Sequence, residues 1–220
     1  MDYNLNFAVV WRDFDLLLSG LGLGLVLALI SIAIGCAIGL VTAFGTLAGN
    51  PLVRGAAKGY VTAIRNTPIL VLIFFTYFAL PQLGVRIGKV ESFVLTLSIY
   101  AGAYLTEVFR AGLIALPRGL REAGLAIGLS ELQTKTSIIV PVMFRNVLPS
   151  LSNNFISLFK DTSLAASIAV PELTFYARQI NVNSFRVIET WLVASLLYVA
   201  TCYLIAHLLR GAERRLAVPG

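Results

Sequence analysis

Few residues in this chain could carry chemistry, and most of them are polar side chains set inside apolar segments. Arg145, Asn146, Asn153 and Asn154 stand at offsets of zero, one, eight and nine within one moderately apolar segment. Polar groups at membrane depth are costly when they face lipid, so they normally face a bundle interior or a water-filled cavity. We therefore expect these residues to contact a solute, with Asn153 and Asn154 ranked above Arg145.

A carboxylate is a further candidate for the same path. Glu107 lies near the far end of another apolar segment and three residues before Arg110, a spacing that lets the two side chains interact on one helix face. We expect Glu107 to serve as a counter-charge to the solute. Arg145 has an alternative role, because an arginine near a helix end can extend to lipid phosphate.

The sequence lacks the patterns of an enzyme active site. It has one histidine and two cysteines, Cys36 and Cys202, each inside an apolar run. There is no His-x-x-Glu-His spacing and no Gly-x-Ser-x-Gly turn. The run Gly20 to Gly24 superficially resembles a dinucleotide loop, but no strand precedes it and no phosphate-binding loop follows. We predict no catalytic residue, no metal site and no cofactor in this chain.

The composition indicates an integral membrane protein. Of 220 residues, 58% are hydrophobic and 13% are charged, and the mean hydropathy is +0.85. That is far more apolar than one soluble core of this size requires. The net charge is +6, but the basic residues are scattered between apolar runs rather than gathered on one stripe. We expect a lipid membrane, and no nucleic acid, as the partner.

Apolar segments of sufficient length predict an all-α protein with about five transmembrane helices. Their expected positions are about 16–44, 67–83, 92–113, 138–159 and 187–209. Residues 1–15 lack the positive region of a secretory signal and are predicted to lie outside the cytoplasm, and residues 216–220 form a C-terminal tail. Ser31, Gly35 and Gly39 repeat at four, which predicts close packing of the first helix.

Prolines and polar stretches divide these helices. Residues 53–64 are predicted to form a helix along the membrane surface. Pro68 is expected at the first position of the helix that follows. In the fourth segment, Pro141 and Pro149 are expected to interrupt the backbone hydrogen bonds.

The segment 117–141 is the one polar, charge-mixed stretch of helical character. Gly128 is expected to break the helix because a residue without a Cβ tolerates the turn. Ser130 and Gln133 form a capping-box pattern that begins a second helix, so two short helices meet at an elbow. One small helical face, suited to docking, is predicted for Leu120, Ala123, Gly124, Ile127 and Gly128.

The spacing within this elbow resembles the EAA loop of ABC importer permeases. Gly128 comes six residues after Glu122, and Ile138 and Pro141 come ten and thirteen residues after Gly128. Ala123 matches the first alanine, whereas Gly124 replaces the second and Val140 replaces the usual leucine. Residues 60–68 and 154–163 are similar to the polar amino acid branch of that family, in which glutamate/aspartate and histidine/arginine permeases are found.

This resemblance implies a type I ABC importer (MetI-like) permease domain over residues 16–215, in a bacterial inner membrane. It also implies the partners: a cytoplasmic ABC ATPase dimer that holds ATP and Mg²⁺, a second permease, identical or homologous, and a periplasmic amino-acid-binding protein. The expected substrate is a polar amino acid such as glutamate or aspartate. The implied ATPase-coupling residues are Glu122, Ala123, Gly124, Gly128, Ile138 and Pro141.

Orientation follows from the basic residues. If the elbow is cytoplasmic, most of the seventeen basic residues lie on the cytoplasmic side, which favours an N-out, C-in topology. An alternative function is an ion-gradient-driven transporter or channel subunit. That function requires buried carboxylates as a relay, yet Glu107 and Asp161 both fall near the ends of predicted spans.

Overall fold

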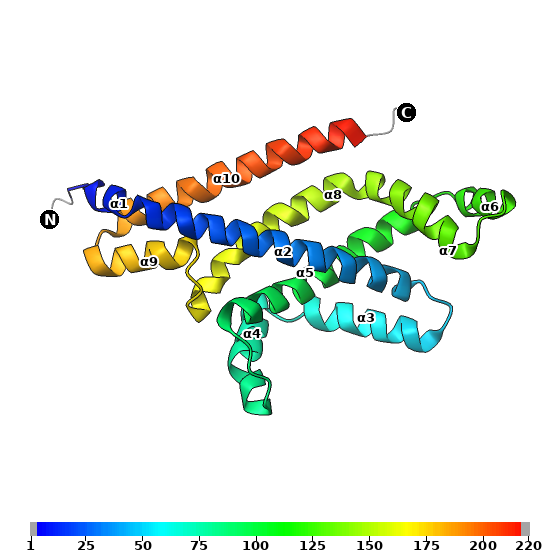
Figure 1. Cartoon of the computed structure of the whole chain (residues 1–220), viewed down its shortest axis with the longest axis horizontal. Coiled ribbons are helices and arrows are strands. Elements are labelled where there is room, and N and C mark those ends of the chain that lie inside the picture. The colour runs from blue at the N-terminus through cyan, green and yellow to red at the C-terminus, as the bar shows by residue number, and fades with distance from the viewer. Residues whose placement is uncertain (1–3, 217–220) are drawn as a thin grey trace.

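The computed structural model describes residues 4–216, and every regular element within them is a helix. Four long helices run roughly along the longest axis of the molecule (Figure 1). They are α2 (Phe14–Thr46), α5 (Lys89–Ile114), α8 (Val140–Asp161) and α10 (Val187–Leu216). The predicted all-α class is confirmed. By length and composition, α2, α5 and α10 could each cross a membrane.

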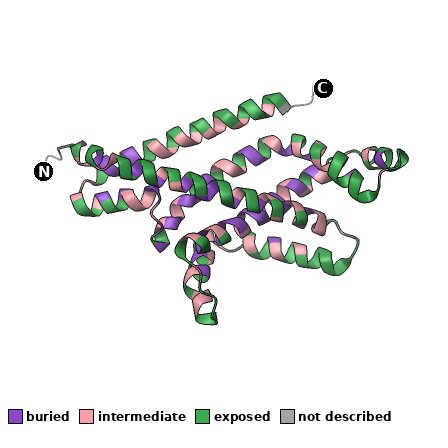
Figure 2. Cartoon of the chain, viewed as in Figure 1, coloured by how far each residue is buried: buried purple, intermediate pink, exposed green. Residues whose placement is uncertain are grey.

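Helices α2 and α5 form the central pair, and small residues bring them together. Gly35 and Gly39 are buried, and a Cβ added to Gly35 would lie 2.6 Å from the Ala101 Cβ. A Cβ added to Gly39 would lie 3.0 Å from the Leu105 Cβ. The first distance is shorter than Cβ atoms tolerate and the second is tighter than most Cβ contacts, so glycine lets the two backbones approach closely. The predicted close packing of the first helix is confirmed, and nearly half of the buried residues in the described chain lie on this pair (Figure 2).

The predicted second span is not a straight helix. Helix α3 (Pro51–Arg65) covers the predicted surface helix, and α4 (Ile69–Phe74) continues as a π-helical turn over Phe75–Ala79 and a 3₁₀ turn over Leu80–Leu83. The two parts meet at 101°, as in a broken span or a re-entrant loop. Figure 1 shows the second part pointing away from the bundle. We name residues 69–83 the arm.

Pro68 explains the bend. It caps α4 with a ψ of 133° and does not occupy the first helical position, so the predicted N1 role is off by one residue. A proline disfavours helical geometry in the residue before it, and α3 therefore ends before Thr67. Pro149 behaves differently, because α8 continues through it and only the backbone hydrogen bond that a proline cannot donate is lost. The carbonyl that Pro149 leaves unpaired belongs to Arg145, and both residues are exposed.

The end of the molecule opposite the elbow is built from α1 (Ala8–Arg12), α9 (Leu173–Ser184) and the start of α10. Glu172 caps α9: its carboxylate accepts from the backbone N–H groups of Thr174 and Phe175 and from the Tyr198 hydroxyl. This side chain is fully buried, and burial raises the pKa of the carboxyl.

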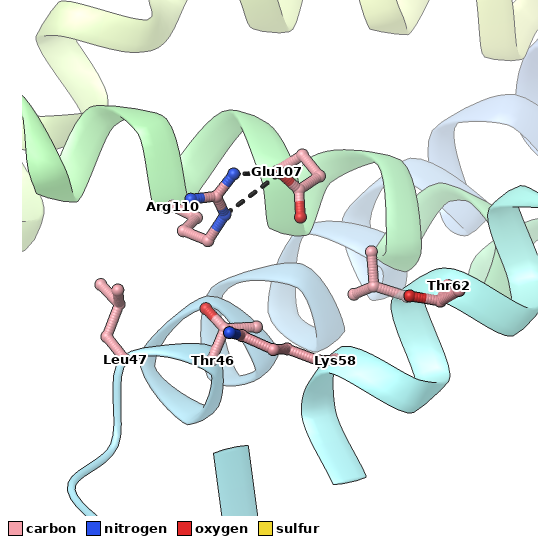
Figure 3. A pocket seen from close by; sticks show the side chains of 7 residues that line it. Thr46, Leu47, Lys58, Thr62, Glu107 and Arg110 are labelled. Carbon is pink, nitrogen blue, oxygen red and sulfur yellow. Dashed lines mark hydrogen bonds and ion pairs between the residues drawn. The ribbon is translucent and has the colours of Figure 1, made fainter. Parts of the chain in front are cut away.

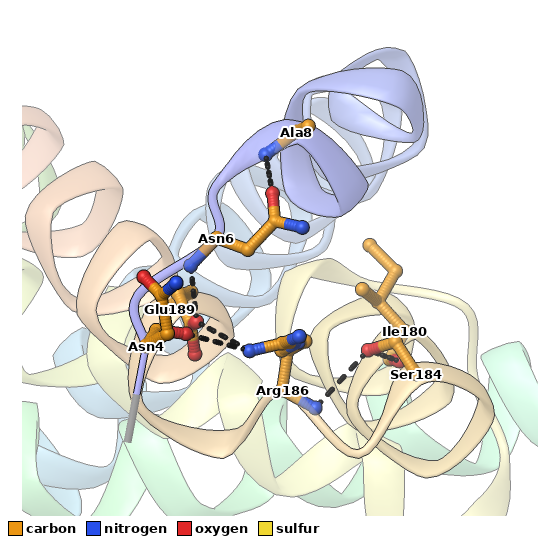
Figure 4. A network of polar contacts seen from close by, with 7 residues as sticks. All are labelled: Asn4, Asn6, Ala8, Ile180, Ser184, Arg186 and Glu189. Atoms are coloured by element: carbon orange, nitrogen blue, oxygen red, sulfur yellow. Dashed lines mark hydrogen bonds and ion pairs between the residues drawn. The ribbon is translucent and has the colours of Figure 1, made fainter. Parts of the chain in front are cut away.

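A polar network ties the N-terminal segment to the same end (Figure 4). The Arg186 guanidinium donates to the Asn4 carbonyl at 2.8 Å and lies 3.6 Å from the Glu189 carboxylate. The Asn6 backbone N–H donates to the same carboxylate at 2.7 Å. Because Glu189 is fully buried, these partners satisfy a charge that would otherwise be costly.

Candidate functional site

The elbow is closed by backbone hydrogen bonds around Gly128. Helix α6 (Arg118–Ala126) ends where Gly128 adopts a φ of +88°. The Leu129 N–H donates to the Gly124 carbonyl at 3.1 Å, and the Gly128 N–H donates to the Leu125 carbonyl at 3.0 Å. This is the pattern of a glycine-terminated helix. The predicted helix break at Gly128 is confirmed.

The second helix of the elbow begins as its sequence predicts. Ser130 caps α7 (Glu131–Thr134), since its hydroxyl accepts from the Gln133 N–H at 3.3 Å. The Gln133 side chain accepts from the Ser130 N–H at 2.8 Å, which completes the capping box. A π-helical turn over Lys135–Ile139 then leads into α8, with Pro141 in its first turn.

The single docking face predicted for α6 is wrong in part, because Gly124 points into the elbow. Gly124 is buried, and a Cβ there would lie 2.6 Å from the Thr134 side chain and 3.1 Å from that of Ile138. Gly124 and Ile138 therefore pack across the junction between the two halves of the elbow, and their role in ATPase coupling stays a prediction. Arg121 and Glu131 add an ion pair across the same junction, with both side chains at least half exposed.

The outer surface of the elbow combines apolar and acidic groups. Ile127 is 75% exposed and Leu132 is 70% exposed. Glu122 and Ala123 are exposed beside them, and Glu122 makes no ion pair with the described residues. Both apolar side chains are therefore available to a partner.

A polar groove lies between α3 and α5, close to the end of α2 (Figure 3). We name it the α3–α5 groove. It consists of two adjoining hollows of about 380 Å³ each, which share Val61, Thr62 and Glu107. The polar residues that line it are Thr46, Lys58, Thr62, Arg65, Asn66, Tyr104, Glu107 and Arg110.

Charges of both signs meet in this groove. The Glu107 carboxylate accepts from the Arg110 guanidinium at 2.5 and 3.1 Å, so the predicted pairing is confirmed. The Arg65 guanidinium lies 5.2 Å from the centre of the Tyr104 ring, a cation–π distance. In Figure 3 the Lys58 side chain extends from α3 toward Thr46, on the side of the groove facing the Glu107 and Arg110 pair. The groove therefore offers three cations and one carboxylate.

Helical spacing positions these groups. Lys58, Thr62 and Arg65 lie four and three residues apart and share one face of α3, while the buried Val61 holds that helix against the bundle. Tyr104 and Glu107 lie three apart on α5. The spacing of Lys58, Thr62 and Arg65 in the sequence could have revealed this polar face of α3. The basic residues there were used only to predict membrane orientation.

The predicted stripe on α8 lies apart from the groove, which is lined by residues of α2, α3 and α5 among the described residues. Arg145, Asn146 and Asn153 are exposed, and the Asn154 amide donates to the Ser150 carbonyl of its own helix at 2.8 Å. At 100° per residue the four span about half of the circumference, so the stripe is broad. Their contact with a solute stays a prediction.

Residues 35–218 match the model of one protein family, described as the binding-protein-dependent transport system inner membrane component. The chain belongs to this family. The glutamine transport system permease protein GlnP of Escherichia coli strain K12 is 35% identical over 97% of this chain and 98% of its own length. The L-cystine transport system permease protein TcyB of Bacillus subtilis is 36% identical over 86% of this chain and 82% of its own length.

Solved structures of the family share the fold. A crystal structure of an amino acid ABC transporter with histidines matches with a TM-score of 0.87 and 29% identity, over 97% of this chain and all of the other. An inward-facing MetNI methionine ABC transporter matches with a TM-score of 0.77 and 19% identity, over 94% of this chain and 99% of the other, which supports the fold alone. The chain is therefore a membrane-embedded transport subunit with the MetI-like fold.

Proposed function

We propose that this chain is the permease subunit of an ATP-driven amino acid importer in a bacterial inner membrane. The proposal rests on the presence of both the elbow and the α3–α5 groove in one chain. The elbow offers exposed Ile127 and Leu132 to a partner, and the groove offers charges of both signs to a solute. The partners are a cytoplasmic ABC ATPase dimer, a second permease subunit and an extracytoplasmic amino-acid-binding protein. With the elbow in the cytoplasm, the topology is N-out and C-in.

The charges in the groove suit a zwitterion. Every α-amino acid carries one carboxylate and one ammonium group, which are complementary to Arg65 or Lys58 and to Glu107, respectively. Such charge-assisted hydrogen bonds are roughly twice as strong as neutral ones. The substrate is a polar amino acid, and glutamate, aspartate and glutamine are the first to test.

ATP-dependent uptake by the reconstituted complex tests this function. The permease and its ATPase are reconstituted in liposomes together with the binding protein. Uptake of labelled glutamate, aspartate and glutamine is then measured with ATP supplied on the side of the membrane where the ATPase lies. Uptake should require ATP and persist when ionophores collapse the ion gradients. Uptake that follows an ion gradient and ignores ATP would instead favour the ion-coupled alternative.

The groove is tested by Glu107→Gln, which keeps the shape and removes the charge. The substrate ammonium group would lose its charge-assisted hydrogen bond to Glu107, so we expect a loss of uptake of about tenfold. Assembly with the ATPase and basal ATP hydrolysis should be unchanged. Glu91→Gln, on the exposed first turn of the same helix, is the control. Wild-type uptake in Glu107→Gln, with a loss in Asn154→Ala, would move the solute path to α8.

A further inference from the structure

From Leu196 onward, α10 presents a bulky apolar face that no described part of the chain covers. Its exposed residues are Leu196, Val199, Tyr203, Leu204 and Leu208, each between 57% and 69% exposed. At 100° per residue they occupy one half of the helix circumference. Only 11% of the most apolar part of α10 is buried, against 61% for α5. This face therefore points away from the bundle.

The same side of α10 carries basic residues beyond the end of the apolar ones. His207, Arg210, Arg214 and Arg215 are all exposed and fall within that arc. The three arginines make no ion pair with the described residues. A hollow of about 500 Å³ lies between the apolar and cationic parts, lined by His207, Leu208, Gly211, Ala212 and Arg215. Gly211 leaves it open, since a Cβ there would meet nothing within 4 Å.

A contact on the opposite side of the helix fixes which way the arginines face. The Glu213 carboxylate accepts from the Ser152 hydroxyl of α8. Glu213 therefore points inward, and its neighbours Arg214 and Arg215 point outward. The side of α10 that faces outward is thus determined by the contact between Glu213 and Ser152 and does not depend on the arginines.

We propose that this face of α10 binds an anionic phospholipid. An acyl chain lies along Leu204 and Leu208, and the phosphate sits in the hollow between His207 and Arg215. Basic clusters directly after an apolar helix attract anionic headgroups, because the charge lies at the depth of the phosphates. A second protein helix fits this face less well. Close helix contacts in membranes use small residues, as α2 and α5 do, whereas this face carries leucine, valine and tyrosine.

Native mass spectrometry of the intact permease and ATPase complex tests the proposal, with phosphatidylglycerol and phosphatidylcholine as probes. Phosphatidylglycerol should bind more tightly than phosphatidylcholine. The double variant Arg214→Gln with Arg215→Gln should weaken phosphatidylglycerol binding about tenfold, because each arginine attracts the anionic headgroup. Arg12→Gln with Arg86→Gln removes the same charge elsewhere and should leave the binding unchanged. Gly211→Leu keeps every charge, fills the hollow and should also weaken the binding.

A photo-activatable residue in place of Leu208 reports what covers the face directly. The expected adduct is a phospholipid. An adduct with a second permease or with the ATPase would overturn the proposal and assign the face to a protein interface. Equal binding of phosphatidylglycerol by the wild-type complex and the Arg214→Gln, Arg215→Gln variant would overturn it as well.

Discussion

At the scale of single residues, Gly128 decides the shape of the elbow. Its φ of +88° lies in the left-handed region, where a side chain is strained whatever the surrounding space. The space itself is open, because a Cβ would meet no atom within 4 Å. The need for glycine is therefore conformational rather than steric.

We predict that Gly128→Val uncouples transport from ATP hydrolysis. A β-branched residue in this conformation costs at least about 1–2 kcal/mol, which is enough to straighten or loosen the turn. Uptake should fall severalfold or more, and assembly of the complex should be measured alongside it. Gly119→Val places the same residue in open space within α6, where the φ is ordinary, and should have little effect. Wild-type uptake in Gly128→Val would rule out the elbow as the coupling element.

Sequence reasoning predicted residue pairs well when both members belong to one helix. The spacing of three between Glu107 and Arg110 was sufficient, as was the capping box at Ser130. It failed for Gly124, because the direction in which a residue points within the elbow depends on where α7 packs. It also missed Arg65 above Tyr104, a contact between two helices far apart in sequence.

At the scale of elements, the α2 and α5 contact is set by glycine. Gly35 and Gly39 recur at four, and the sequence therefore revealed the packing face of α2. The bend between α3 and the arm was harder to predict. Pro68 marked a boundary, but hydropathy alone does not distinguish a straight span from two helices meeting at 101°.

We predict that Gly35→Val destabilises this helix pair. A Cβ at that position would lie 2.6 Å from the Ala101 Cβ, so the helices must separate. Overpacking of this kind costs typically about 1–3 kcal/mol. Thermal denaturation of the purified protein should therefore occur several degrees lower. Gly22→Val makes the same change on the exposed side of α2, where nothing lies within 4 Å, and an equal loss of stability there would refute the packing argument.

At the scale of the whole molecule, one chain forms only part of the wall around a solute path. The arm packs on the bundle through the buried Ile73, but its far end projects from it (Figure 1), and Val71, Phe75, Phe78 and Leu83 are exposed. Its backbone includes π-helical and 3₁₀ turns, whose irregular hydrogen bonding is tolerated at membrane depth only beside protein or water.

We predict that the arm packs against the second permease subunit. Purified protein in mild detergent should not be monomeric, and light scattering coupled to gel filtration measures its mass. Phe75→Gln with Phe78→Gln should shift that mass toward a monomer. Leu196→Gln with Val199→Gln alters an equally exposed apolar pair on α10 and should leave the oligomer intact. A single chain that still transports after reconstitution would contradict this assembly.

The contact between Glu213 and Ser152 also joins the end of α10 to the middle of α8. The arginines that follow the apolar part of α10 belong at the headgroups, and Glu213 among them touches the middle of α8. From Ser152 back to Val140, α8 rises about 18 Å at 1.5 Å per residue. The elbow is therefore joined to α10 through one continuous helix, so a displacement of the elbow is transmitted along α8 to the contact at Ser152.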